Sequence, residues 1–431
     1  MVFGIEPSGD LSGLDAKQVE SVLNKLGNLA REGVEPPIKL DHAVEDYGGS
    51  RLLFVFVPES SVKPVHIRGE DLSVAFLRSG GTTRKASRQE IGTLMLNSRT
   101  PRWEELRTSL LLTDLELTTQ LSLEPVLKMM ERPTPTTNEE MLVWATGERF
   151  IEREPNGGGY ITNLGAISTA RDITEFPDIS RKAVRVIVYQ GLNKSQTKLE
   201  QEGKRGYAIS FQGLLDFVMS HLPQSEVIEQ ALRRKLTIYP AIALREIIAN
   251  ALIHQDFSIT GTGPMIEIFS DRIEISNPGA ILPSKRLDRL IGTQPESRNE
   301  LMARAFRQYK ICEERGSGLL KAGGAIELYG LPPIEFTAGT NYFKVTLHAP
   351  RSFARMSDGE RLQACYQHAV LKYYSDSCMT NTSLRERLKM PEKQRSMVSA
   401  LIQEALEKKL IKAADPENSS KKYAEYVPVW A

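Results

Sequence analysis

Residues 244–257, "LREIIANALIHQDF", place three polar side chains along one side of an otherwise apolar segment. The apolar residues recur at helical spacing, which predicts a helix with a buried face. Glu246, Asn250 and His254 follow one another at intervals of four, so they share one side of that helix. An acid, an amide and an imidazole in one row indicate a polar site beside the core. The alternative is a helix with a structural Asn and a structural His.

The composition favours several domains and excludes a basic field over the whole protein. The chain has 431 residues, 41% of them hydrophobic, which is enough for roughly two to four domains. Lys and Arg number 55 and Asp and Glu 54, so any nucleic-acid surface must be a local patch. Three cysteines suggest a reducing compartment. With no signal pattern and no apolar run near ~18 residues, we expect a cytoplasmic protein without a membrane partner.

Hydrophobic spacing elsewhere predicts an α/β (α+β) fold divided into several domains. A helix is predicted over 16–30 with Asp15 as its N-cap, and another over 87–96 with a Ser-x-x-Glu capping box. Two alternating runs predict a hairpin over 264–279. Further helices are predicted over 211–222, 225–236, 299–309, 361–375, 382–389 and 393–410.

Two glycine-containing segments follow the helix predicted within residues 244–257. "ISNPGAIL" (275–282) ends a predicted strand, and "ERGSGLL" (314–320) opens a predicted helix. Glycines such as Gly316 and Gly318 let backbone N–H groups and a helix N-terminus approach phosphates. Gly279, directly after a strand, would allow close approach of a flat base. The order of the three segments therefore favours a nucleotide site.

The polar side chains of the helix within residues 244–257 could bind a metal ion and activate a water in such a site. An Asn amide oxygen, as in Asn250, is a hard, uncharged ligand suited to Mg²⁺. Glu246, one turn earlier, would orient or deprotonate a water. Arg298 and Asn299 lie where we expect a loop that covers the site. They would serve there as a phosphate contact, or alternatively as a solvated helix cap.

These segments in this order resemble the GHKL ATPases, which include DNA gyrase, histidine kinases and MutL. "LREIIANALIHQDFS", "DRIEISNPG", "RNELMARAF" and "EERGSGL" are more closely similar to a divergent branch, the C-terminal part of bacterial proteins described as RecG-like or as transcriptional regulators. The resemblance covers roughly residues 133–350. It implies a catalytic Glu246, a metal ligand in Asn250, and nucleotide contacts from Asn250, Asn277, Gly279, Gly316, Ser317 and Gly318.

One position departs from the family pattern. The first glycine box of the GHKL family begins with an Asp that accepts the adenine amino proton, whereas Asn277 followed by Pro278 stands here. An Asn carbonyl still accepts that bond, but it is neutral, and the charge-assisted bond would be weakened by about 1 kcal/mol or more. This departure favours a scaffold without nucleotide as one alternative, and Glu246 favours a slow ATPase as another. A P-loop helicase is excluded, because no G-x-x-x-x-G-K-[ST] motif occurs.

The segment "LRSGGTTRKASRQEI" (77–91) combines glycines, hydroxyls and bases at a predicted helix start. This composition suits a phosphate, although a solvated basic turn is equally consistent. Residues 1–98 resemble the C-terminal half of a Schlafen AlbA-type domain, a module expected to bind DNA or RNA. The family's upstream helix and strand have no counterpart, so we expect a truncated start. The predicted nucleic-acid contacts are Arg78, Thr83, Arg84, Lys85 and Arg88.

Residues 361–431 are predicted to form a winged helix with three helices and a hairpin. They carry 12 Lys and Arg against 8 Asp and Glu, a net charge of +4 (12 minus 8). In a recognition helix over 393–410, Val398, Leu401, Ile402 and Leu406 would face the core. The residues expected in the major groove are Lys393, Gln394, Arg395, Ser399 and Gln403. Lys421 and Lys422 on the wing would contact phosphates, and a protein-interaction or dimer module is the alternative.

Together these patterns predict a cytoplasmic bacterial transcriptional regulator that binds double-stranded DNA. Its GHKL-like domain would bind ATP or ADP with Mg²⁺ and modulate nucleic-acid binding or homodimer formation. The alternatives are a slow ATPase in nucleic-acid remodelling and a nucleotide-independent DNA- or protein-binding scaffold. The predicted parts are an AlbA-type module (1–98), a helical connector (99–132), a GHKL-like domain (133–350), a linker (351–360) and a winged helix (361–431).

Overall fold

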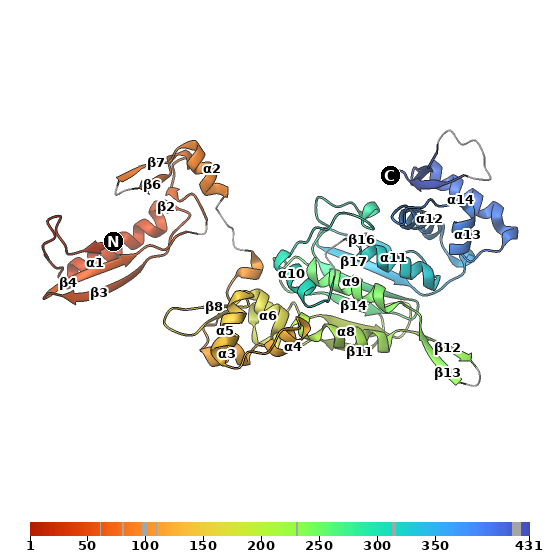
Figure 1. Cartoon of the computed structure of the whole chain (residues 1–431), viewed down its shortest axis with the longest axis horizontal. Helices are drawn as coiled ribbons and strands as arrows, with labels where there is room; N and C mark the ends of the chain where they lie inside the picture. Colours follow the sequence, from red (N-terminus) through yellow and green to blue (C-terminus); the bar gives the residue numbers. More distant parts are fainter. Residues whose placement is uncertain are drawn as a thin grey trace. The chain divides into compact units, whose positions relative to one another are not determined.

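The computed structural model describes residues 1–60, 62–79, 82–96, 102–108, 110–229, 232–312, 316–415 and 424–431. The chain forms two compact units, Met1–Arg102 and Trp103–Ala431, each of which is described by itself (Figure 1). Helices and several sheets occur in both units, which confirms the predicted α/β multidomain class.

The first unit is built on a small antiparallel sheet with strand order β1-β4-β3. Helix α1 (Ala16–Asn28) packs on this sheet through a core of Val19, Leu53 and Val55. Asp15 caps α1 by accepting from the Gln18 N–H at 2.7 Å, as predicted. The strands and the second helix are β1 (Val2–Phe3), β2 (Val34–Glu35), β3 (Asp41–Tyr47), β4 (Ser50–Phe56), β5 (His66–Ile67), β6 (Phe76–Ser79), β7 (Thr82–Lys85) and α2 (Arg88–Leu96).

The second unit is organised around a six-stranded sheet with order β11-β10-β14-β15-β17-β16. Strands β10 and β14 are parallel, and the other neighbours are antiparallel. The predicted hairpin over 264–279 is confirmed as β14 and β15, joined at Ser270–Asp271. The strands are β10 (Arg185–Tyr189), β11 (Thr197–Glu202), β14 (Met265–Ile268), β15 (Arg272–Pro278), β16 (Glu335–Ala338) and β17 (Tyr342–His348).

Helices α8, α9 and α11 cover one face of this sheet (Figure 1). Alternation along β15 turns Ile273 and Ile275 towards α9, and both side chains are buried with Leu244 and Ile247 of that helix. The other helices before the C-terminal tail (residues 358–431) pack around the same core or its edge. The bounds are α3 (Asp114–Thr119), α4 (Leu123–Met129), α5 (Asn138–Gly147), α6 (Asn163–Thr169), α7 (Pro177–Ser180), α8 (Tyr207–His221), α9 (Ala241–Ile253), α10 (Glu300–Gln308) and α11 (Gly318–Tyr329).

The residues around α3 and α4, which precede the six-stranded sheet in the sequence, belong to the core of the second unit. Leu117, Leu121 and Val126 are fully buried in the same cluster as the sheet residues. A short hairpin of β8 (Ile151–Arg153) and β9 (Gly159–Ile161) lies beside these helices.

The helix predicted over 225–236 is wrong. This segment forms a two-stranded hairpin of β12 (Gln224–Glu229) and β13 (Leu232–Thr237), which extends away from the sheet in Figure 1. Apolar residues in a segment this short fit both a helical and an alternating period, so the pattern does not decide between them.

The tail forms α12 (Asp358–Tyr373), α13 (Asn381–Arg387), α14 (Arg395–Glu407) and the hairpin of β18 (Ile411–Ala413) and β19 (Tyr426–Pro428). As predicted, Val398, Leu401 and Ile402 are buried, and Leu406 is partly buried against them. The predicted start of the last helix is two residues early. Residues 392–394 form a separate 3-10 turn after Pro391, so Lys393 and Gln394 precede α14.

Candidate functional site

A cavity of about 180 Å³ lies between α9, β15, the loop 280–298 and the start of α11. It brings together Glu246, Asn250, Asn277, Gly316 and Gly318, which the sequence had placed in three separate segments. His254 also lines it. Gly279 and Ser317 do not, although Ser317 occupies the N-cap position of α11.

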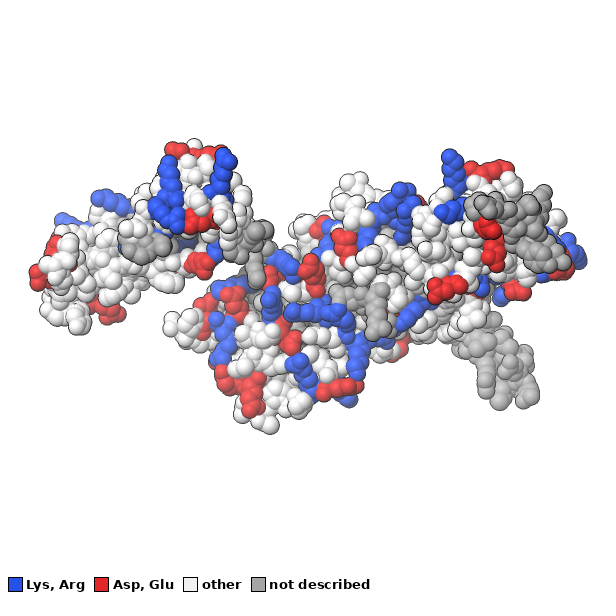
Figure 2. Space-filling model, turned by 45° about the horizontal axis from the view of Figure 1, so that its top comes forward, with Lys and Arg blue, Asp and Glu red and all other residues white. Residues whose placement is uncertain are grey.

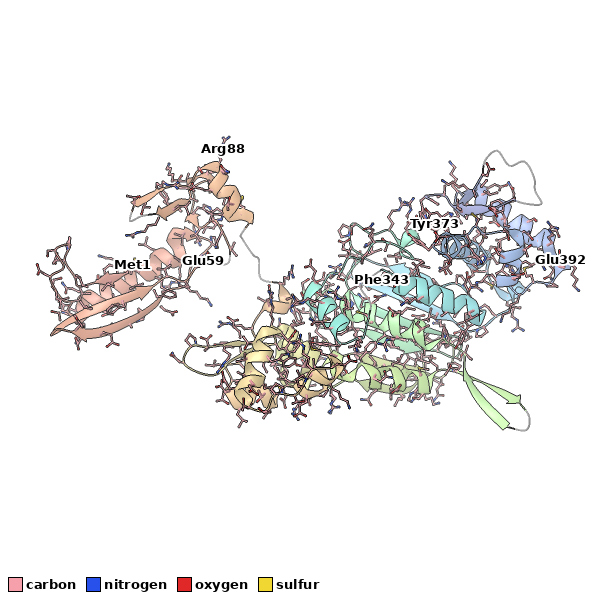
Figure 3. The ribbon with its side chains drawn as sticks, viewed as in Figure 1. Met1, Glu59, Arg88, Phe343, Tyr373 and Glu392 are labelled. Atoms are coloured by element: carbon pink, nitrogen blue, oxygen red, sulfur yellow. The ribbon has the colours of Figure 1, made fainter. Side chains whose placement is uncertain are left out.

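The half of the cavity beside β15 and β17 is lined by apolar side chains. The Phe336 and Phe343 rings lie nearly parallel, at 22°, with centroids 6.2 Å apart. Strand β17, which carries Phe343 (Figure 3), pairs with β15 so that Phe343 is opposite Asn277. Other apolar residues of the lining include Ile247, Ala251, Ile275, Leu319 and Val345. Flat rings above one buried amide suit a planar, partly polar group.

Asn277 faces this apolar half because it continues the alternation of Ile273 and Ile275 along β15. It is 4% exposed, and its Nδ2 donates to the Pro278 carbonyl at 3.1 Å. This bond uses one N–H of the Asn277 amide, so its second N–H and its oxygen are left for a ligand in the cavity.

The Glu246 carboxylate lies against the first residue of α11. It is 7% exposed, and a Cβ at Gly318 would be 2.4 Å from its Oε2. Glycine is therefore required at 318 for this approach. A carboxylate is favoured at a helix N-terminus, where backbone N–H groups carry partial positive charge.

Gly279 has a different role from the predicted clearance for a base. It adopts φ +105°, and a Cβ there would lie 2.7 Å from the Asp256 Cβ. The space beside Gly279 is thus filled by Asp256 of the same chain. Asp256 in turn forms an ion pair with Arg298 at 3.1 Å, so Gly279 positions a cation of the cavity wall indirectly.

The loop 280–298 contributes two cations to the cavity. Arg298 donates through Nη2 to the Ala280 carbonyl at 2.7 Å, and its buried Nε has no acceptor among the described residues. Lys285 lies 3.6 Å from Glu296 Oε2 and donates to Thr293 Oγ1 at 3.4 Å. Sequence reasoning left Arg298 open and missed Lys285. The bases between the two glycine segments were the available signal.

Asn299 is neither a phosphate contact nor a solvated cap. It is buried, and its Nδ2 donates to the carbonyls of Ile253 at 2.7 Å and Gln255 at 2.8 Å. These are carbonyls at and beyond the end of α9, which the helix itself leaves without donors.

His254 caps the end of α9, where its N–H donates to the Asn250 carbonyl at 2.9 Å. Burial, followed by the charges of Arg298 and Lys285, lowers the pKa of His254 from 6.5 to about 4. The imidazole is therefore neutral at physiological pH and offers both a donor and an acceptor to the cavity.

The predicted phosphate contacts of the first unit lie on and beside the β6–β7 hairpin. Arg78, Thr83, Lys85 and Arg88 are exposed, and Figure 2 shows Lys and Arg side chains on this part with acidic ones among them. Arg84 is different, because it forms an ion pair at 2.6 Å with Glu90. All five predicted contacts are thus open to solvent, and the charge of Arg84 is partly neutralised by Glu90.

The predicted groove-facing residues of the tail are distributed over the 3-10 turn and α14. Arg395, Ser399 and Gln403 are exposed on α14, and Ser399 Oγ accepts from Asn381 Nδ2 at 3.0 Å. Lys421 and Lys422 lie outside the described residues.

In the described part of the chain, no group of three or more His, Cys, Asp or Glu is arranged to hold a metal ion. None of the helices in this part has the length and apolar character needed to cross a bilayer.

Part of the second unit is similar to a known protein family. Residues 261–347 match the family described as "Putative ATP-dependent DNA helicase recG C-terminal". This match supports a RecG-like, ATPase-like domain in the region that holds β14, β15, the loop 280–298 and α11. No curated protein matches the chain.

A solved structure also aligns with the chain. The crystal structure of the DIP2311 protein from Corynebacterium diphtheriae is 16% identical and aligns with a TM-score of 0.48 over 99% of this chain and 82% of that one.

Proposed function

We propose that the cavity binds ATP or ADP with Mg²⁺, and that the protein is a bacterial DNA-binding transcriptional regulator. In this proposal the ligand modulates nucleic-acid binding or homodimer formation. The observation that carries it is the convergence of Glu246, Asn250 and Asn277 with the α11 N-terminus in one cavity. The match of residues 261–347 to a RecG C-terminal family adds support.

The residues present fit a nucleotide. The Asn277 oxygen and the Phe336–Phe343 rings suit a base with an amino group. Lys285, Arg298 and the N-terminus of α11 suit phosphates. When bound, Mg²⁺ would supply positive charge against the phosphates, and the Asn250 amide oxygen would hold it.

Calorimetric titration of Mg-ATP and Mg-ADP into wild type and Asn250→Ala tests the proposal. We expect binding in the wild type that weakens at least tenfold in the variant, which corresponds to about 1.4 kcal/mol. Absence of binding in the wild type would contradict the proposal and favour a nucleotide-independent scaffold, for which the neutral Asn277 is the specific observation.

A slow ATPase is the second candidate, and the placement of Glu246 favours it. The carboxylate is buried one helical turn from Asn250, within the same cavity. Turnover that falls at least a hundredfold in Glu246→Gln while Mg-ATP affinity is retained would support a general-base role. Unchanged turnover would exclude Glu246 as the base.

Exposed cations support the nucleic-acid part of the proposal. Arg78, Lys85 and Arg88 belong to one hairpin and the following helix, and Arg395 begins α14. Basic side chains at the start of a helix are typical phosphate contacts, which hold nucleic acid without reading its sequence.

A further inference from the structure

The loop 280–298 has two sides with different partners. Towards the cavity it presents Lys285, Leu290 and Thr293. Its other side contacts the tail, where Ile291 is 6% exposed and belongs to the same core cluster as the tail helices. The wall of the candidate site is thus also a surface on which the tail packs.

Two tyrosine hydroxyls of the tail bind the backbone of this loop. Tyr366 of α12 donates to the Asp288 carbonyl at 2.7 Å, and Tyr374 donates to the Gly292 carbonyl. Trp430 holds Tyr366 in place, because its Nε1 donates to the Tyr366 hydroxyl at 2.9 Å.

Gly292 makes the second contact possible. It adopts φ +79°, and a Cβ there would lie 2.0 Å from the Tyr374 ring. The Tyr374 ring therefore packs directly on the loop backbone, and any larger residue would displace one from the other.

Helix α11 provides a second connection between the cavity and the tail. Its first residues, Gly318 and Leu319, line the cavity. Nearer its end, Glu327 forms an ion pair with Arg387 at 3.1 Å, and its Oε2 lies 2.9 Å from His368 Nδ1. Both structural elements that would contact phosphates are therefore also bound by the tail.

We propose that the tail positions the candidate ligand site, with Tyr366 and Tyr374 as positioning residues that hold the loop 280–298 over the cavity. Ligand affinity then depends on the tail, and by linkage a bound ligand stabilises the tail against the loop. The ligand part of this inference rests on the proposed function, whereas the positioning part does not.

The backbone hydrogen bonds within the loop are local, so contacts with residues outside the loop hold it against the rest of the unit. The described backbone bonds within it are short-range turns, such as Arg289 to Arg286 at 3.0 Å and Thr293 to Leu290 at 3.4 Å. Such turns fix local geometry but do not fix the loop relative to the cavity. The hydroxyls of Tyr366 and Tyr374 hold the loop relative to the cavity, because they belong to residues more than 70 positions away in sequence.

The test compares Tyr366→Phe, Tyr374→Phe and the double variant with Tyr373→Phe as the matched control. Tyr373, labelled in Figure 3, ends α12, and its hydroxyl makes no hydrogen bond to the described residues. Hydrogen exchange of peptides within 285–296 measures loop opening without any ligand. We expect exchange to rise about fivefold for each hydroxyl removed, which corresponds to about 1 kcal/mol, and to stay unchanged in the control.

Titration of Mg-ATP into the same variants then separates the two proposals. We expect affinity to fall severalfold in the double variant and not in Tyr373→Phe. Unchanged loop exchange in the double variant would overturn the positioning role. Faster exchange without nucleotide binding in the wild type would uphold positioning and refute the nucleotide. Faster exchange with unaltered affinity would overturn the coupling between tail and ligand.

Discussion

Replacing Arg387 by Met should destabilise the contact between the tail and the second unit's core by about 3 kcal/mol. The Arg387 side chain is 5% exposed and pairs with Glu327 Oε1 at 3.1 Å. It also donates to the Leu331 carbonyl at 2.7 Å. Removal of one partner of a buried pair leaves the other charge in the interior, and such changes typically cost about 3–5 kcal/mol. The lower end applies because His368 still lies beside Glu327.

The control is an exposed pair in the same unit. Arg185 and Glu200 pair with both side chains 47% exposed. Arg185→Met should therefore cost about 0–1 kcal/mol. The two variants make the same Arg→Met substitution, and they differ mainly in how deeply the replaced side chain is buried.

The assay is hydrogen exchange across a urea series, read on α12 and α13 peptides for Arg387→Met and on β10 and β11 peptides for Arg185→Met. It reads the free energy of local opening, which is needed because a chain with more than one unit does not have to unfold in one step. The double variant Glu327→Gln/Arg387→Met should be destabilised by less than the sum of the two single variants. The second substitution removes the Glu327 charge that Arg387→Met leaves unpaired. Equal costs for Arg387→Met and Arg185→Met would refute the reasoning.

Three further outcomes follow from the site and the surface. Gly318→Ala should weaken Mg-ATP binding at least tenfold by calorimetry, because its Cβ would lie 2.4 Å from Glu246 Oε2, whereas Gly324→Ala, with open space on the same helix, should leave affinity unchanged. The pKa of His254 is about 4 in the folded protein against 6.5 in the unfolded chain, so the unfolded chain binds the proton first and stability should fall as pH decreases from 6.5 to 4. The loss is at most about 3 kcal/mol, reduced by the water that reaches the cavity, and urea unfolding of His254→Gln should show a smaller one. DNA affinity should fall with salt at a slope near −0.9 per phosphate neutralised in a fluorescence titration, and a flat response would contradict nucleic-acid binding.

Local signals in the sequence predicted much of the fold. Asp15 and the Ser87–Glu90 pair cap their helices as expected, because a cap involves only residues three apart. The β14–β15 hairpin and α9 were predictable since each has a long, regular apolar period. The segment 225–236 was not, because its short apolar run fits two periods and the chain context decides.

The candidate site was predicted in part for the same reason. Glu246 and Asn250 share a helix face whatever surrounds them, so their convergence followed from spacing alone. Lys285 and the tail's two tyrosines reach the site or its wall through loops and distant helices. No periodic pattern encodes such contacts, which arise only when the elements pack.

Three glycines near the cavity show where sequence reasoning stops. A conformation or clearance that needs glycine is foreseeable at Gly279 and Gly318, and both were assigned to a ligand. In the structure the space beside Gly279 holds Asp256, that beside Gly318 holds Glu246, and that beside Gly292 holds Tyr374. Each glycine thus admits a side chain of the protein itself. A ligand in this cavity would therefore meet functional groups that the glycines position, as well as bare backbone, and this is why substitutions at these glycines test the site as directly as substitutions of the charged residues do.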